Sequence, residues 1–210
     1  MIKKRLHAHS RGFTIIELMI ATSAFSLLLM AMLSAFVFLG RLYYKGISEA
    51  NTQEVARSVL SRTSDVVRLS GSSIANAPAS FGWDGAHCIG NKKYSYKINK
   101  QLTSNVEDDT LQSDQVLIES DDPGCSNTRS SDPRPGDNPN ELLEELMGLA
   151  EFNILEQNNL VDVDITITLG DNDQFTRDDQ GKAIGCQSDM AGSEFCAVSE
   201  LDTVVFRKVN

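Results

Sequence analysis

Positive charge is scarce in this chain outside its first residues. The 210 residues include 19 Lys and Arg against 29 Asp and Glu, for a formal net charge of −10. Four of the basic residues lie within the first 12 positions, so the rest of the chain holds 15 basic residues against 29 acidic ones. Binding to nucleic acid requires a basic face that neutralises phosphates. The composition therefore argues against a nucleic-acid partner, and we expect none.

Catalytic groups are scarce as well. His87 is the only histidine after the first 12 residues, and its neighbour Cys88 is expected in a disulfide, not as the free thiolate that a Cys–His pair needs. The serines lack the GxSxG turn of serine hydrolases. Four carboxylates resemble an acid–base set but follow ordinary amphipathic patterning: Glu141, Glu144, Glu145 and Glu151. We expect no enzymatic activity and no cofactor.

Ionisable residues are absent from Leu18 to Gly40. At about 1.5 Å per residue, a helix of this length crosses a hydrocarbon core of about 30 Å. The basic residues before it place the N-terminus in the cytoplasm and the rest of the chain outside. The apolar run is too long for an ordinary secretory signal, which ends sooner at a small-residue cleavage site. Arg41 and Lys45 follow it, either as juxtamembrane anchors or as contacts to neighbouring chains.

The helical pattern continues beyond the apolar segment. No proline occurs before Pro78, and apolar residues recur at a helical spacing on one face: Val55, Ala56, Val59, Leu60, Thr63, Val66 and Val67. The sequence therefore predicts one helix from about Thr14 to Leu69. Its first half is membrane-spanning, and its second half packs on a folded head.

Four cysteines follow the apolar segment: Cys88, Cys125, Cys186 and Cys196. None belongs to a CxxC pair, which argues against a zinc ribbon or a thioredoxin-type site. An even number of cysteines beyond a membrane anchor indicates two disulfides. Three pairings are possible. We favour Cys186–Cys196, because its loop is short, and Cys88–Cys125 by elimination.

The stretch RGFTIIELMIA, residues 11–21, contains one carboxylate inside the apolar run, Glu17. A basic leader that ends at Gly12, then Phe13 and an apolar helix with this glutamate, resembles the type IV prepilin signature. The resemblance covers about residues 11–45. It implies cleavage between Gly12 and Phe13 by prepilin peptidase, N-methylation of Phe13, and assembly into a filament whose core is a bundle of such helices.

Glu17 has a physical role consistent with this resemblance. A carboxylate at the centre of a membrane helix costs about 2.5–3.5 kcal/mol on insertion scales, and less near the interface. In a staggered bundle, the cationic amine of Phe13 from a neighbouring subunit can pair with Glu17 in a low-dielectric surrounding. The alternative is that Glu17 lies at the membrane surface and reaches water.

The remaining residues, 70–210, predict a β-rich head with a surface loop at 121–140. Strands are expected at 92–98, 114–120, 160–170 and 201–209, with a turn at Asn158-Asn159. Residues 70–90 are predicted to form a loop, and residues 141–156 either a short helix or an extended run that leads into a strand. The fold class is α+β, pilin-like: a long N-terminal helix packed on one antiparallel sheet. The domains are a leader (1–12), a transmembrane half-helix (13–40), an amphipathic half-helix (41–69) and the head.

Two groups in the head are candidate binding residues. The loop 170–179 holds four aspartates that offer hard oxygen ligands for calcium: Asp171, Asp173, Asp178 and Asp179. The loop lacks the glycine and glutamate of an EF-hand, so an exposed acidic hairpin loop is the favoured alternative. Four aromatic residues are either a binding surface or, more commonly, core: Phe81, Trp83, Tyr94 and Tyr96.

The resemblance to type IV prepilins, together with the loop-rich head and its two candidate disulfides, implies a structural minor pilin of a type IV pilus. We expect other pilin subunits, the prepilin peptidase and the pilus assembly platform as partners. Before assembly the chain is a single-pass protein of the cytoplasmic membrane with its head outside, and afterwards it is part of a surface filament. The alternatives are a pseudopilin of a type II secretion or DNA-uptake system, and a surface adhesin that uses the helix only as an anchor.

Overall fold

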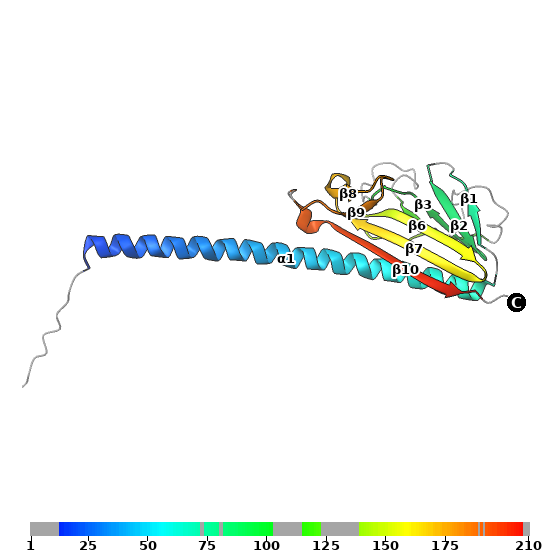
Figure 1. Cartoon of the computed structure of the whole chain (residues 1–210), viewed down its shortest axis with the longest axis horizontal. Helices are drawn as coiled ribbons and strands as arrows, with labels where there is room; N and C mark the ends of the chain where they lie inside the picture. Colours follow the sequence, from blue (N-terminus) through cyan, green and yellow to red (C-terminus); the bar gives the residue numbers. More distant parts are fainter. Residues whose placement is uncertain are drawn as a thin grey trace, which may run out of the picture. The chain divides into compact units, whose positions relative to one another are not determined.

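A computed structural model describes residues 13–71, 74–79, 82–102, 115–122, 139–188, 190 and 192–207. The chain divides into two compact units, Met1–Tyr43 and Tyr44–Asn210. The boundary between them lies within a single long helix, α1 (Ile15–Ser70), which is labelled in Figure 1. The extent of this helix confirms the predicted one to within a residue at each end. It ends where Gly71 takes a left-handed conformation, with φ of 59°, as glycine does after many helices.

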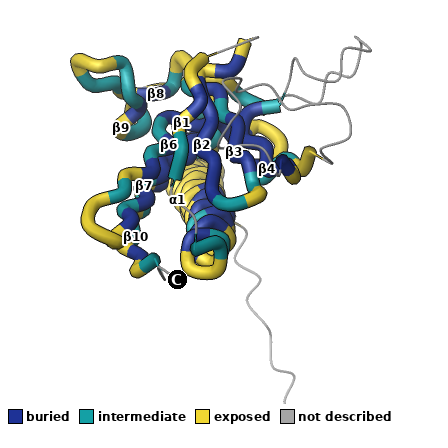
Figure 2. The backbone as a smooth tube through the Cα atoms, turned by 90° about the vertical axis from the view of Figure 1, so that its right-hand side faces the viewer, coloured by how far each residue is buried: buried dark blue, intermediate teal, exposed yellow. Residues whose placement is uncertain are grey.

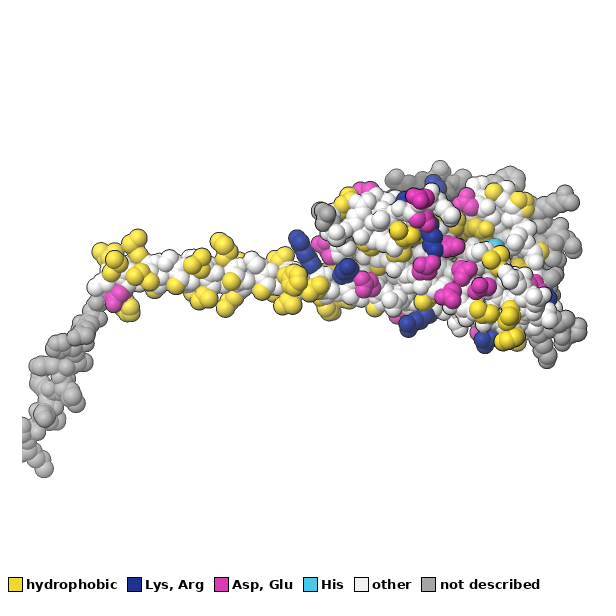
Figure 3. All heavy atoms as spheres, viewed as in Figure 1, with side chains coloured by type: hydrophobic (Ala, Val, Ile, Leu, Met, Phe, Trp, Pro, Cys, Tyr) yellow, Lys and Arg dark blue, Asp and Glu magenta, His cyan; other side chains and the backbone are white. Residues whose placement is uncertain are grey.

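In the first unit, α1 is apolar on all sides. Every described residue from Phe13 to Tyr43 is exposed, apart from the half-buried Gly40. Figure 3 shows large hydrophobic side chains on both edges of this part of the helix. A helix that is hydrophobic all round is stable only in an apolar surrounding such as lipid or a bundle of helices.

In the second unit, one face of α1 is buried. The predicted stripe is confirmed, since Val55, Ala56, Val59 and Val67 are at most 8% exposed. Small polar residues extend the buried face at Ser48, Thr52, Thr63 and Ser64. The Thr52 hydroxyl donates a hydrogen bond of 2.7 Å to the carbonyl of Ser48, so its burial leaves no unmet donor.

A five-stranded antiparallel sheet comes first along the head, with its strands in chain order. Its members are β1 (Ile74–Ala77), β2 (Gly85–Ile89), β3 (Lys92–Tyr96), β4 (Leu117–Asp121) and β5 (Asn140–Glu141). The expected strands at 92–98 and 114–120 are confirmed. The expectation of a loop at 70–90 is wrong, because β1 and β2 lie there.

The small residues that suggested a loop at 70–90 are needed by the packing of β2. All five residues of β2 are buried. A Cβ on Gly85 would lie 2.5 Å from the hydroxyl of Tyr96 on the adjacent strand β3. A Cβ at this position would force the Tyr96 ring to shift, so close packing, not a turn, favours glycine here.

A three-stranded antiparallel sheet is formed by β6 (Met147–Gln157), β7 (Leu160–Leu169) and β10 (Ala197–Phe206), in the order β10-β7-β6. The ambiguous segment 141–156 is therefore mainly strand. Asn158 and Asn159 form the predicted turn, with φ of 51° and 68°, as two-residue hairpins favour. On β7, the alternating residues Val161, Val163, Ile165 and Ile167 are fully buried, as predicted.

The expectation of one sheet is also wrong. Besides the two sheets there is a short two-stranded ribbon of β8 (Phe175–Arg177) and β9 (Ala183–Cys186), with 3-10 turns η2 (Asn172–Gln174) and η3 (Ser193–Phe195). Figure 2 looks along α1 and shows the strands arching over it, from β10 on one side to β4 on the other. One main core joins α1 to both larger sheets, and a smaller core lies under the ribbon.

Candidate functional site: the start of the helix and its support

Reciprocal hydrogen bonds between Thr14 and Glu17 cap the first turn of α1. The backbone N–H and the hydroxyl of Thr14 each donate a hydrogen bond of 2.9 Å to Oε2 of Glu17. In return, the backbone N–H of Glu17 donates to the Thr14 hydroxyl at 3.3 Å. This reciprocal pair is a capping box, with Thr14 as the N-cap and Glu17 three residues into the helix.

The capping box gives Glu17 a partner within its own chain. Neither of the two roles expected for this carboxylate, pairing with another subunit or reaching water, included this contact. Its signal is legible in the sequence, since Thr-x-x-Glu before an apolar run is a helix-start pattern. A carboxylate at this end of a helix also interacts favourably with the helix dipole.

The surroundings of the capping box are apolar and open. Phe13 is 87% exposed, and Ile15 and Ile16 beside Glu17 are 82% and 67% exposed. Gly12, the expected residue before the cut, lies outside the described residues. The helix that follows is long and apolar enough to cross a membrane, and none of its most apolar stretch is buried within the chain. Exposed apolar surface of this extent marks contact with a membrane or with other proteins.

An ion pair links α1 to the five-stranded sheet. Arg62 on α1 reaches the buried Glu119 on β4 with two contacts, Nε to Oε2 at 2.5 Å and Nη2 to Oε1 at 3.1 Å. Lys92 on β3 contacts the same carboxylate at 3.0 Å and Asp121 at 2.7 Å. Burial works to raise the pKa of Glu119, but hydrogen bonds from Arg62 and Lys92 outweigh it and hold the pKa below its usual value.

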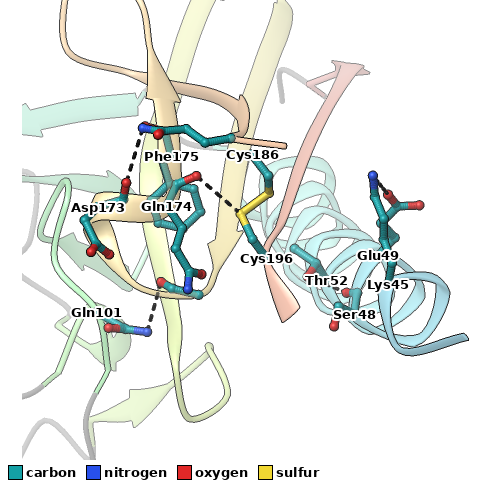
Figure 4. Close-up of a disulfide and its surroundings, with 12 residues drawn as sticks. Lys45, Ser48, Glu49, Thr52, Gln101, Asp173, Gln174, Phe175, Cys186 and Cys196 are labelled. Carbon is teal, nitrogen blue, oxygen red and sulfur yellow. Dashed lines mark hydrogen bonds and ion pairs between the residues drawn. A yellow bond between two sulfur atoms is a disulfide. The ribbon is translucent and has the colours of Figure 1, made fainter. Parts of the chain in front are cut away.

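The predicted disulfide Cys186–Cys196 is confirmed, with an S–S distance of 2.00 Å (Figure 4). It ties β9 to the residue just before β10, and Cys196 is fully buried. Cys88 is also disulfide-bonded. Its expected partner Cys125 lies outside the described residues.

The four aspartates considered for calcium are not assembled into a ligand set. In the described part of the chain, no group of three or more His, Cys, Asp or Glu side chains is placed to hold a metal ion. One oxygen of Asp178 accepts two backbone N–H groups at 2.9 Å, those of Gln180 and Lys182. The guanidinium of Arg177 also lies in this loop and donates to Asn172 and Gly181. Calcium binding here stays a prediction.

The aromatic residues considered for binding lie in or against the core where they are described, and Tyr96 is only partly buried. Trp83 is 2% exposed and Tyr94 is fully buried, whereas Phe81 lies outside the described residues. His87 is enclosed between Tyr96 and Phe152, at ring-centroid distances of 5.2 and 5.4 Å. Its ring is thus part of the packing and does not face a cleft.

Glu141 has a structural task that its sequence pattern does not reveal. Its carboxylate accepts backbone N–H groups from Val116, Leu117 and Leu143, at 2.8, 3.0 and 3.2 Å. These bonds join the start of β4 to the chain beyond β5. Burial nevertheless raises the pKa of Glu141, against the effect of these hydrogen bonds. The acid–base set considered from the sequence is therefore not required to explain this residue.

Comparison with known proteins agrees with the geometry at the start of α1. Residues 7–33 match the family model described as the prokaryotic N-terminal methylation motif. Searches among curated proteins and among solved structures found no significant match. The matched stretch contains the leader end, Phe13, the capping box and the first turns of the exposed helix. The α+β arrangement behind it is consistent with a pilin fold. Residues 7–33 thus resemble the N-terminal segment of prepilins, and this match supports a type IV pilin-like prepilin.

Proposed function

We propose that this prepilin is a minor pilin, a structural subunit that is built into a type IV pilus through α1. The observation that carries the proposal is the first half of α1, which is apolar on every side, exposed apart from Gly40, and begins within the methylation motif. Lipid covers this segment before assembly, and the same segments of other subunits cover it in the filament. Prepilin peptidase cuts between Gly12 and Phe13, and the new amine of Phe13 is methylated.

In the proposed mechanism, Glu17 changes partners during assembly. In the single chain the capping box holds its carboxylate, which eases its position at the end of an apolar helix. After the cut, the amine of Phe13 is cationic. In the filament core, the amine of one subunit pairs with Glu17 of another, where the low dielectric strengthens the attraction. The pair fixes the axial register of neighbouring helices.

We propose a minor pilin and not a major one because the head is elaborate. It carries a five-stranded sheet, a three-stranded sheet, a two-stranded ribbon and more than one disulfide-bonded segment. A pseudopilin of a type II secretion or DNA-uptake system is the second candidate, since it would use the same N-terminal segment. We propose the pilus assembly platform and other pilins as partners. The cytoplasmic membrane is the location before assembly.

The capping box provides matched variants that separate charge from helix capping. Glu17→Gln keeps an acceptor for the capping box and removes the charge, whereas Thr14→Ala weakens the cap and keeps the charge. We expect Glu17→Gln and Glu17→Ala to be processed but absent from sheared surface filaments, and Thr14→Ala to be present. Intact mass gives the N-terminus, and immunoblotting of sheared filaments gives incorporation.

Other outcomes would contradict specific parts of the proposal. Incorporation of Glu17→Gln at the parent level would show that Glu17 acts as a helix cap, not as a charge. Surface display of all three variants, independent of other pilins, would favour an adhesin on a plain anchor. A mature chain that never appears in surface filaments, although correctly cut at Phe13, would favour a pseudopilin.

A further inference from the structure

An aromatic pair lies in the second unit, where the part of α1 that belongs to this unit begins. The ring of Phe195, at the end of η3, packs against Tyr44 with a centroid distance of 5.4 Å and an interplanar angle of 51°. Both rings remain half exposed, Tyr44 at 52% and Phe195 at 50%. Ile47, one turn further on the same helix, is 48% exposed. These three residues form an apolar surface, here called the aromatic patch.

Phe195 ends a 3-10 turn that is held by a hydrogen bond and a neighbouring disulfide. Its backbone N–H donates to the carbonyl of Gly192 at 2.9 Å, and the next residue, Cys196, is fixed by the disulfide to Cys186. Gly192 has φ of 90°, which residues with a Cβ rarely adopt. Cys196 is fully buried while its neighbour Phe195 points outward. An apolar patch held at the surface in this way is a candidate contact with a membrane or with another protein.

The position of the patch along the chain indicates which occupant. Tyr44 follows Gly40, the last residue of the uncharged segment, by four residues, about one helical turn. Arg41 and Lys45 are the first charged residues after that segment. Tyrosine rings, interleaved with Lys or Arg at the end of an apolar helix, are typical of the headgroup layer of a membrane.

The charges near the patch favour an apolar attachment. Lys45 is paired with Glu49 at 4.0 Å, and the half-buried Glu194 precedes Phe195. The patch has no excess of positive charge to attract anionic lipids. Insertion of rings into the layer between headgroups and acyl chains needs no such attraction.

We propose that the aromatic patch inserts into the headgroup layer on the outer side of the cytoplasmic membrane before assembly. This inference rests on the membrane anchoring in the proposed function. Phe195 and Tyr44 then hold the disulfide-closed end of the head on the lipid. Extraction of the subunit into a filament must release this contact together with the helix.

Depth-dependent fluorescence quenching tests the proposal on the full chain. The chain is reconstituted into phosphatidylcholine vesicles, with or without lipids brominated high on the acyl chain. Phe195→Trp is compared with Ile184→Trp, an exposed control on β9 that is 57% exposed, and with the parent chain, whose single Trp83 is buried. We expect brominated lipid to remove most of the added emission of Phe195→Trp and none from Ile184→Trp or the parent.

Phe36→Trp, within the apolar segment, separates failure of the inference from failure of the proposed function. Quenching of Phe36→Trp without quenching of Phe195→Trp would leave the anchor intact and overturn the inference. If neither is quenched, the anchoring itself is wrong, and the inference falls with it. If Phe195→Trp is shielded from both brominated lipid and aqueous iodide, a second subunit covers the patch. The proposal that lipid covers it is then wrong.

Discussion

At the scale of single residues, His87 shows how burial sets a charge state. Its ring lies between Tyr96 and Phe152, with Nδ1 2.8 Å from Oδ1 of Asn76 and Nε2 3.3 Å from the carbonyl of Phe152. Burial lowers its pKa from 6.5 to about 4, although the contact with Phe152 works in the opposite direction. The ring is therefore neutral in the folded head at neutral pH.

This shift makes the stability of the head dependent on pH. Well above pH 6.5, His87 is neutral in both the folded and the unfolded chain, so it adds no dependence there. Between pH 6.5 and 4, the unfolded chain binds a proton that the folded chain does not, so the free energy of unfolding falls with pH. The loss reaches about 3 kcal/mol by pH 4.

Urea unfolding of the processed chain in detergent, at a series of pH values, measures this dependence. We expect His87→Gln to be less stable than the parent at pH 7 but to lose less stability between pH 6.5 and 5, since carboxylate titration is common to both chains and cancels in the comparison. His87 is the only histidine after the leader, so no other histidine contributes. Equal slopes for parent and variant in this window would contradict the prediction.

At the scale of elements, a small network of ion pairs joins α1 to the five-stranded sheet. Glu119 on β4 is only 3% exposed, and it depends on Arg62 from α1 and Lys92 from β3. Because the pKa of Glu119 is lowered, its contribution to stability is present above its unfolded-state pKa and is lost as pH falls through the folded one. Removing a partner leaves a buried carboxylate less satisfied.

Replacing Arg62 tests this link between helix and sheet. We expect Arg62→Met to lower the free energy of unfolding by about 1–3 kcal/mol at pH 7, the usual cost of leaving a buried acceptor unsatisfied. Arg57→Met, at an exposed position on the same helix, is the control and is expected to have little effect. The measurement is chemical unfolding. A loss that persists unchanged when Glu119 is also replaced by Gln would show that Arg62 acts without this pair.

The elements that could be predicted are those whose signal is local. The helix end, the Asn158-Asn159 turn and the alternation on β7 each follow from a few neighbouring residues. Strand β2 could not be predicted, because its Gly85 is small for a reason located on β3, the ring of Tyr96. The Arg62–Glu119 pair joins residues 57 positions apart, and no local pattern reveals it. In the candidate site, the Thr-x-x-Glu pattern of the capping box is visible in the sequence, but the roles predicted for Glu17 did not include it.

At the scale of the whole molecule, the boundary between the two units predicts that the second unit folds without the first. The first buried residue of α1 is Ser48, and the second unit begins at Tyr44. Everything that forms the core therefore lies after Tyr43, whereas the segment before it contributes only exposed apolar surface. A chain that begins at Tyr44 should lose the need for detergent and keep the head.

We expect this shortened chain to be soluble and to unfold cooperatively, within about 4 °C of the full chain in detergent, a shift that about 1 kcal/mol produces in a domain of this size. A chain that begins at Ser61 is the control. It lacks Val55, Ala56 and Val59, which are buried against the sheets, so it should fail to fold. Circular dichroism with temperature distinguishes the two. If the chain from Tyr44 also fails to fold, the first half of α1 supports the head directly, and membrane anchoring is then not its only task.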